Sequence, residues 1–271
     1  MRIFKLLINI GYDNSVESDL VAVTLNSGST HAKNMRMGAE QKGALTNATA
    51  GHKARSVIVL STNQVFLSSL QTTTFTARVN RRQIGDPTGE RNSSNNITLI
   101  NIGYDNFMRG EFIAAALIPD SSHAKNIRHE AKEKGTLINA TSGHRTRSVI
   151  VLSTNQVVLC SLQTTTFAAR VNKSHRHKTL INIGYDNFLR GEFVAGTLVA
   201  DSTHATKTRN EAKEKGILIN ATSGHKTRSL AVMITKQVVL CSLRSPTLSE
   251  KINKYRNKQH IDPGNDGQDI M

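Results

Sequence analysis

The sequence of 271 residues contains no tryptophan, and aromatic residues make up only 4% of it. Proteins that hold single-stranded nucleic acid commonly stack the bases on aromatic side chains. This chain is therefore poorly equipped for that mode of binding. Contact with the phosphates of a duplex, by contrast, needs no aromatic residues.

Cysteine is almost absent as well. The two cysteines, Cys160 and Cys241, occupy the same position in two related segments, and each ends an apolar run, Val157–Cys160 and Val238–Cys241. This setting indicates a small buried side chain in a strand, and not a disulfide, a metal ligand or a nucleophile. Such usage fits a reducing cytosol, so we expect a cytoplasmic protein.

The sequence also lacks an apolar run long enough to cross a membrane. The apolar opening, Ile3–Ile10, is far shorter than the ~20 residues of a membrane-spanning helix. Because this stretch has counterparts later in the chain, we interpret it as a strand and not as a signal peptide. No membrane partner is expected.

Acidic residues are outnumbered, with 20 Asp and Glu against 35 Lys and Arg, which gives a formal net charge of +15. Such an excess favours a polyanionic partner, with nucleic acid ahead of an anionic membrane. The basic residues recur at fixed places along the chain, which further favours double-stranded DNA.

The chain contains three copies of one pattern. Leu99–Phe107 returns as Leu180–Phe188, and a diverged copy opens the chain at Leu7–Asn14. In each copy a basic turn follows 40 residues after the glycine of this motif. The turns are Gly51–Arg55, Gly143–Arg147 and Gly224–Arg228. Equal spacing without gaps indicates that each copy is one small folded domain.

The middle copy is preserved best and shows the expected order of elements. The elements are strands at Leu99–Ile102 and Glu111–Ile118, a helix from Ser121 or Ser122 to Lys134, a strand from Leu137, a hairpin of Val149–Leu152 and Val157–Leu162, and a closing helix at Thr164–Val171. This order, ββαβββα, predicts an α+β fold of three tandem small domains with mostly antiparallel sheets.

Composition predicts where the domains end. The expected divisions are a divergent first repeat (1–80), a flexible linker (81–96), a second repeat (97–172), a basic linker (173–178), a third repeat (179–251) and a disordered tail (252–271). The first repeat differs most at Ser15–Asp19, which replaces Phe107–Glu111 of the second.

Several segments of the middle copy, taken in order, resemble the RemA-like family. They are Leu99–Gly103, Asn139–Thr141 leading into Gly143–Arg147, and Val149–Val151. The family comprises small bacterial DNA-binding regulators of extracellular-matrix and biofilm genes. The resemblance implies a transcription regulator whose domains form rings and present the basic turn outward, so that DNA contacts many domains at once.

The resemblance also implies which residues contact DNA. The first arginine of the family's turn is replaced by histidine in all three copies of this chain. The second arginine is replaced by lysine at Lys53 and Lys226, and lysine lacks the bidentate guanidinium of arginine. A further basic residue early in the family's second strand aligns with Phe112 and Phe193, for which Arg109 and Arg190 are the nearest substitutes. The expected DNA-binding residues are His52, Lys53, Arg55, His144, Arg145, Arg147, His225, Lys226, Arg228, Arg109 and Arg190.

Other interpretations of the basic turns stay open. Arg145 and Arg147 could pair with acidic residues of a neighbouring repeat and so hold an assembly together. The alternative function is then a self-assembling structural module with weakened or lost DNA binding. Fusion of three domains raises the effective concentration of the sites. The three domains could also form an arc that closes into a ring only with other chains, so self-association is expected.

No motif of catalysis or metal binding is complete. Tyr104–Asn106 is interpreted as a turn with local backbone bonds and not as a catalytic trio. We find no nucleophile elbow, phosphate loop or paired carboxylates, so we expect neither an enzyme nor a cofactor. Three histidine pairs lack the further ligands of a tetrahedral metal site: His123 with His144, His204 with His225, and His175 with His177.

Overall fold

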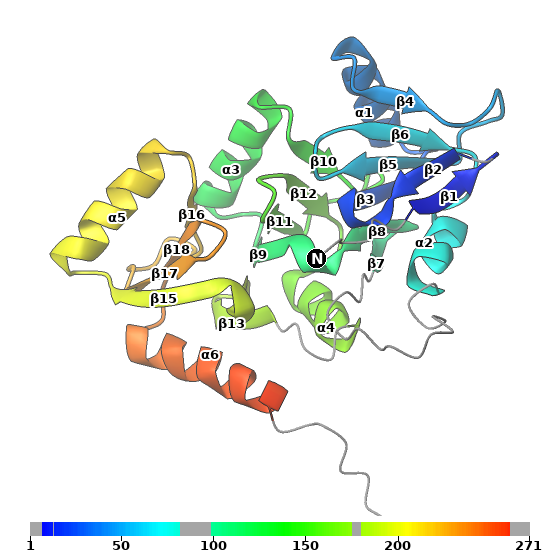
Figure 1. Cartoon of the computed structure of the whole chain (residues 1–271). Coiled ribbons are helices and arrows are strands. Elements are labelled where there is room, and N and C mark those ends of the chain that lie inside the picture. Colours follow the sequence, from blue (N-terminus) through cyan, green and yellow to red (C-terminus); the bar gives the residue numbers. More distant parts are fainter. Residues whose placement is uncertain (1–6, 13, 82–98, 175–179, 261–271) are drawn as a thin grey trace, which may run out of the picture.

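A computed structural model describes residues 7–12, 14–81, 99–174 and 180–260, and it contains three units of one fold placed side by side (Figure 1). The middle unit contains β7 (Leu99–Gly103), β8 (Asn106–Arg109), β9 (Ile113–Leu117), α3 (Ser122–Glu133), β10 (Leu137–Asn139), β11 (Ser148–Leu152), β12 (Val157–Cys160) and α4 (Thr164–Ser174).

The first and third units repeat this order. The first contains β1 (Leu7–Gly11), β2 (Asn14–Glu17), β3 (Val21–Asn26), α1 (Thr30–Gln41), β4 (Leu45–Asn47), β5 (Ser56–Leu60), β6 (Val65–Ser68) and α2 (Thr72–Arg81). The third contains β13 (Leu180–Gly184), β14 (Asn187–Arg190), β15 (Val194–Val199), α5 (Thr203–Glu214), β16 (Leu218–Asn220), β17 (Ser229–Met233), β18 (Val238–Cys241) and α6 (Ser245–His260).

The predicted α+β class is confirmed, but each unit has one strand more than expected. In the middle unit that strand is β8, and the strand predicted from Glu111 begins only at Ile113, after a 3-10 turn. Tyr104 and Asp105 join β7 to β8 with φ angles of 52° and 55°. Two successive residues with positive φ form the tight turn that suits a hairpin.

The additional strand pairs with the preceding unit. β8 pairs with β3 in antiparallel register, with Val23 opposite Met108, and β14 pairs with β9, with Ala115 opposite Leu189. The resulting sheets have the orders β4-β6-β5-β3-β8-β7 and β10-β12-β11-β9-β14-β13. The first hairpin of each later unit therefore completes the sheet of the unit before it.

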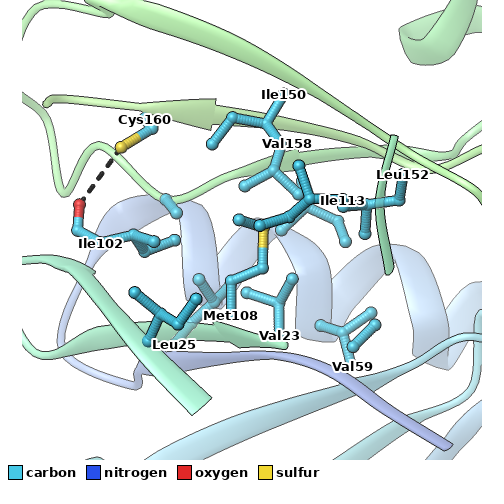
Figure 2. Close-up of a cluster of buried hydrophobic side chains, with 14 of the residues drawn as sticks. Val23, Leu25, Val59, Ile102, Met108, Ile113, Ile150, Leu152, Val158 and Cys160 are labelled. Atoms are coloured by element: carbon cyan, nitrogen blue, oxygen red, sulfur yellow. Dashed lines mark hydrogen bonds between the residues drawn. The ribbon is translucent and has the colours of Figure 1, made fainter. Parts of the chain in front are cut away.

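The hydrophobic core is continuous across the boundary between units. Figure 2 shows Val23 and Val59 of the first unit packed against Met108 and Ile113 of the middle unit. All four side chains are almost fully buried, with exposed fractions of 1% or less. Removal of apolar surface from water therefore stabilises the junction as well as each unit.

Local signals explain the three 12-residue helices α1, α3 and α5, which lie on one side of the structure (Figure 1). Ser121 caps α3 by accepting a hydrogen bond from the N–H of Ala124 at 3.1 Å, and Gly135 follows the helix with a φ of 67°. A serine at the N-cap and a glycine at the C-terminal end are common boundary signals of helices. α1 and α5 begin and end in the same way.

The chain ends and linkers agree only partly with expectation. Residues 82–98, 175–179 and 261–271, which include most of both predicted linkers and half of the predicted tail, lie outside the described residues. α6 continues to His260, so the tail expected to be disordered from residue 252 begins as helix. The reason is that Pro246 lies in the first turn of the helix, where proline is tolerated, and the next proline and glycine come only at Pro263 and Gly264. No helix in the described part of the chain is both long and apolar enough to cross a membrane.

Both cysteines are buried and form no disulfide, as their apolar context predicts. The thiol of Cys160 donates to the carbonyl of Ile102 at 3.3 Å (Figure 2). At the equivalent position of the first unit, the hydroxyl of Ser68 donates to the carbonyl of Ile10 at 2.7 Å. Burial raises the pKa of Cys160, and it raises the pKa of Cys241 to about 12.

We therefore expect neither cysteine of the folded protein to react with a water-soluble disulfide reagent at pH 8. A raised thiol pKa leaves little thiolate, and burial blocks access. The absorbance of released thiolate should stay flat for native protein and show both cysteines reacting after addition of urea. Rapid modification of the native protein at either cysteine would contradict the buried placement.

Candidate nucleic-acid interface

The basic turn of each unit is a tight turn shaped by the residues before it. In the middle unit the N–H of His144 donates to the carbonyl of Thr141 at 3.0 Å. The two central residues, Ser142 and Gly143, have φ angles of 52° and 87°. Asn139 holds the entrance, because its side-chain oxygen accepts from the N–H and the hydroxyl of Thr141 at 3.0 and 2.7 Å. The other two units repeat these bonds.

The cations of the turns lie on the surface. After the turn the chain enters a buried strand at Ser148, and the N–H of Arg147 already donates to the carbonyl of Cys160 at 2.8 Å. This hydrogen bond fixes the backbone at the start of the strand, and the side chains of the turn before it stay exposed to solvent. The exposed residues are His52, Lys53, Arg55, His144, Arg145, Arg147, His225, Lys226 and Arg228.

A tyrosine stacks on the histidine of every basic turn, a feature that was not predicted from the sequence. The ring planes are within 5° of parallel in all three units. The centroid distances are 4.2 Å for Tyr12 and His52, 3.9 Å for Tyr104 and His144, and 3.6 Å for Tyr185 and His225. Tyrosine and histidine are equally spaced in all three copies, and this spacing was the sequence signal that could have predicted the stack. The stack limits the positions that each histidine ring can adopt.

A buried asparagine connects the turn of one unit to the unit before it. The side-chain nitrogen of Asn106 donates to the carbonyl of Ala140 at 2.9 Å and to the hydroxyl of Ser142 at 3.0 Å. Its oxygen accepts from the N–H of Asn26, in the preceding unit, at 2.9 Å. The interpretation of Tyr104–Asn106 as a purely local turn is therefore wrong for Asn106, whose partners are distant in sequence. Asn187 makes the same bridge between the middle and third units.

Consecutive basic turns are neighbours along the structure. A hollow of about 360 Å³ is lined by Lys53 and Arg55 of the first unit and by Asp105 of the middle unit. Asp105 directly follows Tyr104, which stacks on His144 of the next basic turn. The hairpin that joins two units therefore brings the first turn close to the second.

Few acidic residues neutralise these cations. Arg145 pairs with Asp120 of its own unit at 3.6 Å, and the two side chains are 78% and 75% exposed. A pair this exposed contributes little to stability. Within the described residues Arg147 forms no ion pair. The suggestion that these arginines bind acidic groups of a neighbouring repeat thus finds no support in these contacts.

Arg109 and Arg190 lie at the junctions between units and not beside the basic turns. Arg190 is 1% exposed, donates to the carbonyl of Gly110 in the preceding unit, and lies 5.3 Å from the centroid of the Phe193 ring. Burial lowers its pKa, while the nearby Glu192 raises it. Arg109 is 8% exposed and donates to the carbonyl of Ser18 at 3.0 Å. In these positions neither side chain can reach a duplex.

The described residues contain no group of three or more histidine, cysteine or acidic side chains that could hold a metal ion.

The fold and the surface together define a class: a basic α+β protein built from tandem units, each presenting one cationic turn. The model of the RemA-like family, described as extracellular matrix regulatory protein A-like, matches residues 7–79, 99–171 and 180–252. The chain belongs to this family and contains three copies of its domain.

Similar single-domain proteins carry a regulatory name. The chain is 43% identical over 83 residues to a protein named "Putative regulatory protein" from Alkaliphilus metalliredigens, a match that covers 31% of this chain and 89% of that protein. It is 46% identical over 79 residues to a protein of the same name from Caldicellulosiruptor saccharolyticus, covering 29% and 78%. Each of these relatives therefore corresponds to about one unit of this chain.

The placement of Arg190 predicts a large effect on stability. Replacing Arg190 with Ala removes a buried charge that bonds across the junction, and we expect the free energy of unfolding to fall by about 2–4 kcal/mol. Urea unfolding followed by circular dichroism measures this change. Arg147→Ala is the matched control, with an expected change within about 0.5 kcal/mol because the side chain is exposed. Equal effects of the two substitutions would contradict the junction role.

Proposed function

We propose that this protein is a DNA-binding transcriptional regulator of the RemA type, of the kind that controls extracellular-matrix and biofilm genes in the bacterial cytoplasm. The observation that carries the proposal is the repetition of one exposed cationic turn in every unit, with each turn held by the same backbone bonds. The regulatory names of similar proteins support it.

Contact through phosphates explains how such turns bind. A single turn offers two cations and therefore weak, salt-dependent affinity. Turns on a common scaffold act together, because each neutralised phosphate releases counterions and adds about 0.9 to the salt dependence of log K. The junction hairpins hold neighbouring turns in a constant relation, so little conformational entropy is lost on binding. Sequence preference then comes largely from how easily the duplex deforms.

Removing four turn cations should weaken duplex binding. In the variant R145A/R147A/K226A/R228A we expect affinity for a labelled duplex to fall by about tenfold or more at moderate salt. The slope of log K against log salt should fall by roughly 0.9 for each phosphate that the variant no longer neutralises. Fluorescence anisotropy over a range of sodium chloride concentrations measures both quantities.

The matched control removes the same number of charges elsewhere. Lys132, Lys134, Lys213 and Lys215 are exposed at the C-terminal ends of α3 and α5. The variant K132A/K134A/K213A/K215A should keep most of the affinity. If both variants lose affinity equally, net charge and not the turns governs binding, and an unchanged turn variant would remove the proposal.

A second proposal concerns self-association. We infer that chains associate end to end. The first and third units each have a strand edge that pairs with no other strand in the described residues, whereas the equivalent edges between units are paired. β15 is the last strand of its sheet in the described structure, and Ala195 and Gly196 are exposed there, whereas the equivalent Ala114 and Ala115 are covered by β14. At the other end β1 and β2 form a two-stranded sheet that adds to no larger one in the described residues. An exposed edge strand pairs readily with another strand.

The end-to-end contact should be weaker than the internal junctions. Glu17 stands where Arg109 and Arg190 bridge the units, and Ser15 stands where a phenylalanine is buried. The variant S15F/E17R restores the internal pattern and should shift the protein toward larger species at micromolar concentration, measured by size exclusion with light scattering. Glu40→Arg on the exposed face of α1 carries the same charge change and should have no effect.

Identical masses for wild type and S15F/E17R would refute the end-to-end contact. The same measurement distinguishes the DNA-binding regulator from the alternative function, a self-assembling structural module. A turn variant that stays assembled but does not bind DNA supports the regulator, and a turn variant that falls apart supports a structural module held together by the turns.

A further inference from the structure

We propose that the first unit, which diverges most in sequence, carries the strongest phosphate-binding site of the three. This inference rests on the proposed function and ranks the three units within it. The site is a crevice of about 540 Å³ between the basic turn and helix α1. Lys33 and Arg36 of α1 line it together with His52 and Lys53 of the turn.

The crevice is cationic and contains no acidic group. Its lining has no aspartate or glutamate. Lys33, Arg36 and Lys53 are exposed, and within the described residues none of the three takes part in an ion pair. A phosphate group entering the crevice would thus meet cations that it need not share with a protein carboxylate. Uncompensated cations gathered in one hollow attract an anion more strongly than paired ones do.

The other two units have a carboxylate at the position equivalent to Gly28, which lines the crevice of the first unit. The residue before the N-cap serine is Gly28 in the first unit, Asp120 in the middle unit and Asp201 in the third. In the middle unit Asp120 pairs with Arg145, the counterpart of Lys53, at 3.6 Å. Because glycine stands at this position in the first unit, Lys53 lacks the counter-charge that Asp120 gives Arg145.

The count of charges ranks the three sites. The first unit has three cations and no acid at these positions, namely Lys33, Arg36 and Lys53. The middle unit has three cations and one acid, namely Lys125, Arg128, Arg145 and Asp120. The third unit has two cations and one acid, namely Arg209, Lys226 and Asp201, because Thr206 replaces the lysine.

A second hollow on the same turn favours a chain of phosphates over a single one. His52 and Lys53 also line a hollow of about 620 Å³ that contains Arg55 and Arg78. The guanidinium of Arg78 is held there by the side-chain oxygen of Asn9 at 2.9 Å. The turn thus stands between two cationic hollows, which suits successive phosphodiesters of one duplex strand better than an isolated anion.

The first unit can accept the aspartate of the other two without a large rearrangement. The backbone of Gly28 is not in the left-handed region, and the nearest atom to a Cβ built there is the side-chain oxygen of Asn26 at 3.3 Å. That side chain needs to move by only a few tenths of an ångström. Gly28→Asp and its uncharged counterpart Gly28→Asn are therefore comparable substitutions.

The test compares these two variants for duplex binding by fluorescence anisotropy. We expect Gly28→Asp to weaken affinity by about threefold at low salt, and by less at high salt, because a local carboxylate competes with phosphate. Gly28→Asn should bind like the wild type. In the opposite direction, Asp120→Asn should tighten binding by about twofold, since it frees Arg145.

The outcomes separate the inference from the proposed function. If wild type binds duplex but Gly28→Asp and Gly28→Asn are equal, the ranking of the sites is overturned and the regulator remains. If wild type fails to bind duplex, both fall. A titration with a nucleoside triphosphate distinguishes the other source of phosphate: if Gly28→Asp weakens that binding and leaves duplex affinity unchanged, the crevice is a nucleotide site and the proposal is overturned.

Discussion

The structure depends on one interaction, the pairing of each unit's first hairpin with the sheet of the unit before it. A strand edge left open exposes unsatisfied backbone groups, and a unit of this size buries too little apolar surface to be very stable alone. β8 and β14 pair with the open edges of β3 and β9, and their apolar side chains complete a core that two neighbouring units share. The tandem arrangement therefore stabilises the junctions between units and also multiplies the basic turns.

The same pairing connects stability to the candidate interface. The hairpin that completes a neighbouring sheet also carries Tyr104, which stacks on the turn histidine, and Asn106, which bonds to the turn and to the preceding unit at once. A change at the junction would therefore move the cationic turn. Repetition of these bonds at Tyr185 and Asn187 keeps the relation between units constant. Proteins that bind a regular polymer benefit from such constancy, since their sites must match its repeat.

The positions of the turns could be predicted from the sequence, and the junctions could not. Glycine followed by two cations, ahead of a run such as Val149–Val151, indicates a turn entering a buried strand whatever its neighbours are. Phe107–Arg109, however, follows a turn, contains an arginine, and looks like a loop until a neighbouring strand is placed beside it. Arg190 resembles a surface cation in the sequence for the same reason, although packing against the preceding unit buries it.

The sequence by itself determined the number of units, their class, the capped helices, the buried cysteines and the exposed cationic turns, because these follow from local periodicity, turn chemistry and charge. Only the tertiary structure decided which strands pair across units, which arginines are buried, and that Gly28 leaves Lys53 without the counter-charge that Asp120 gives Arg145. The first two features depend on residues far apart in the sequence, such as Asn26 and Asn106, that meet only when neighbouring units pack, and the third depends on a helix and a turn that meet when one unit folds. Their contacts are set by long-range geometry, which no local pattern records.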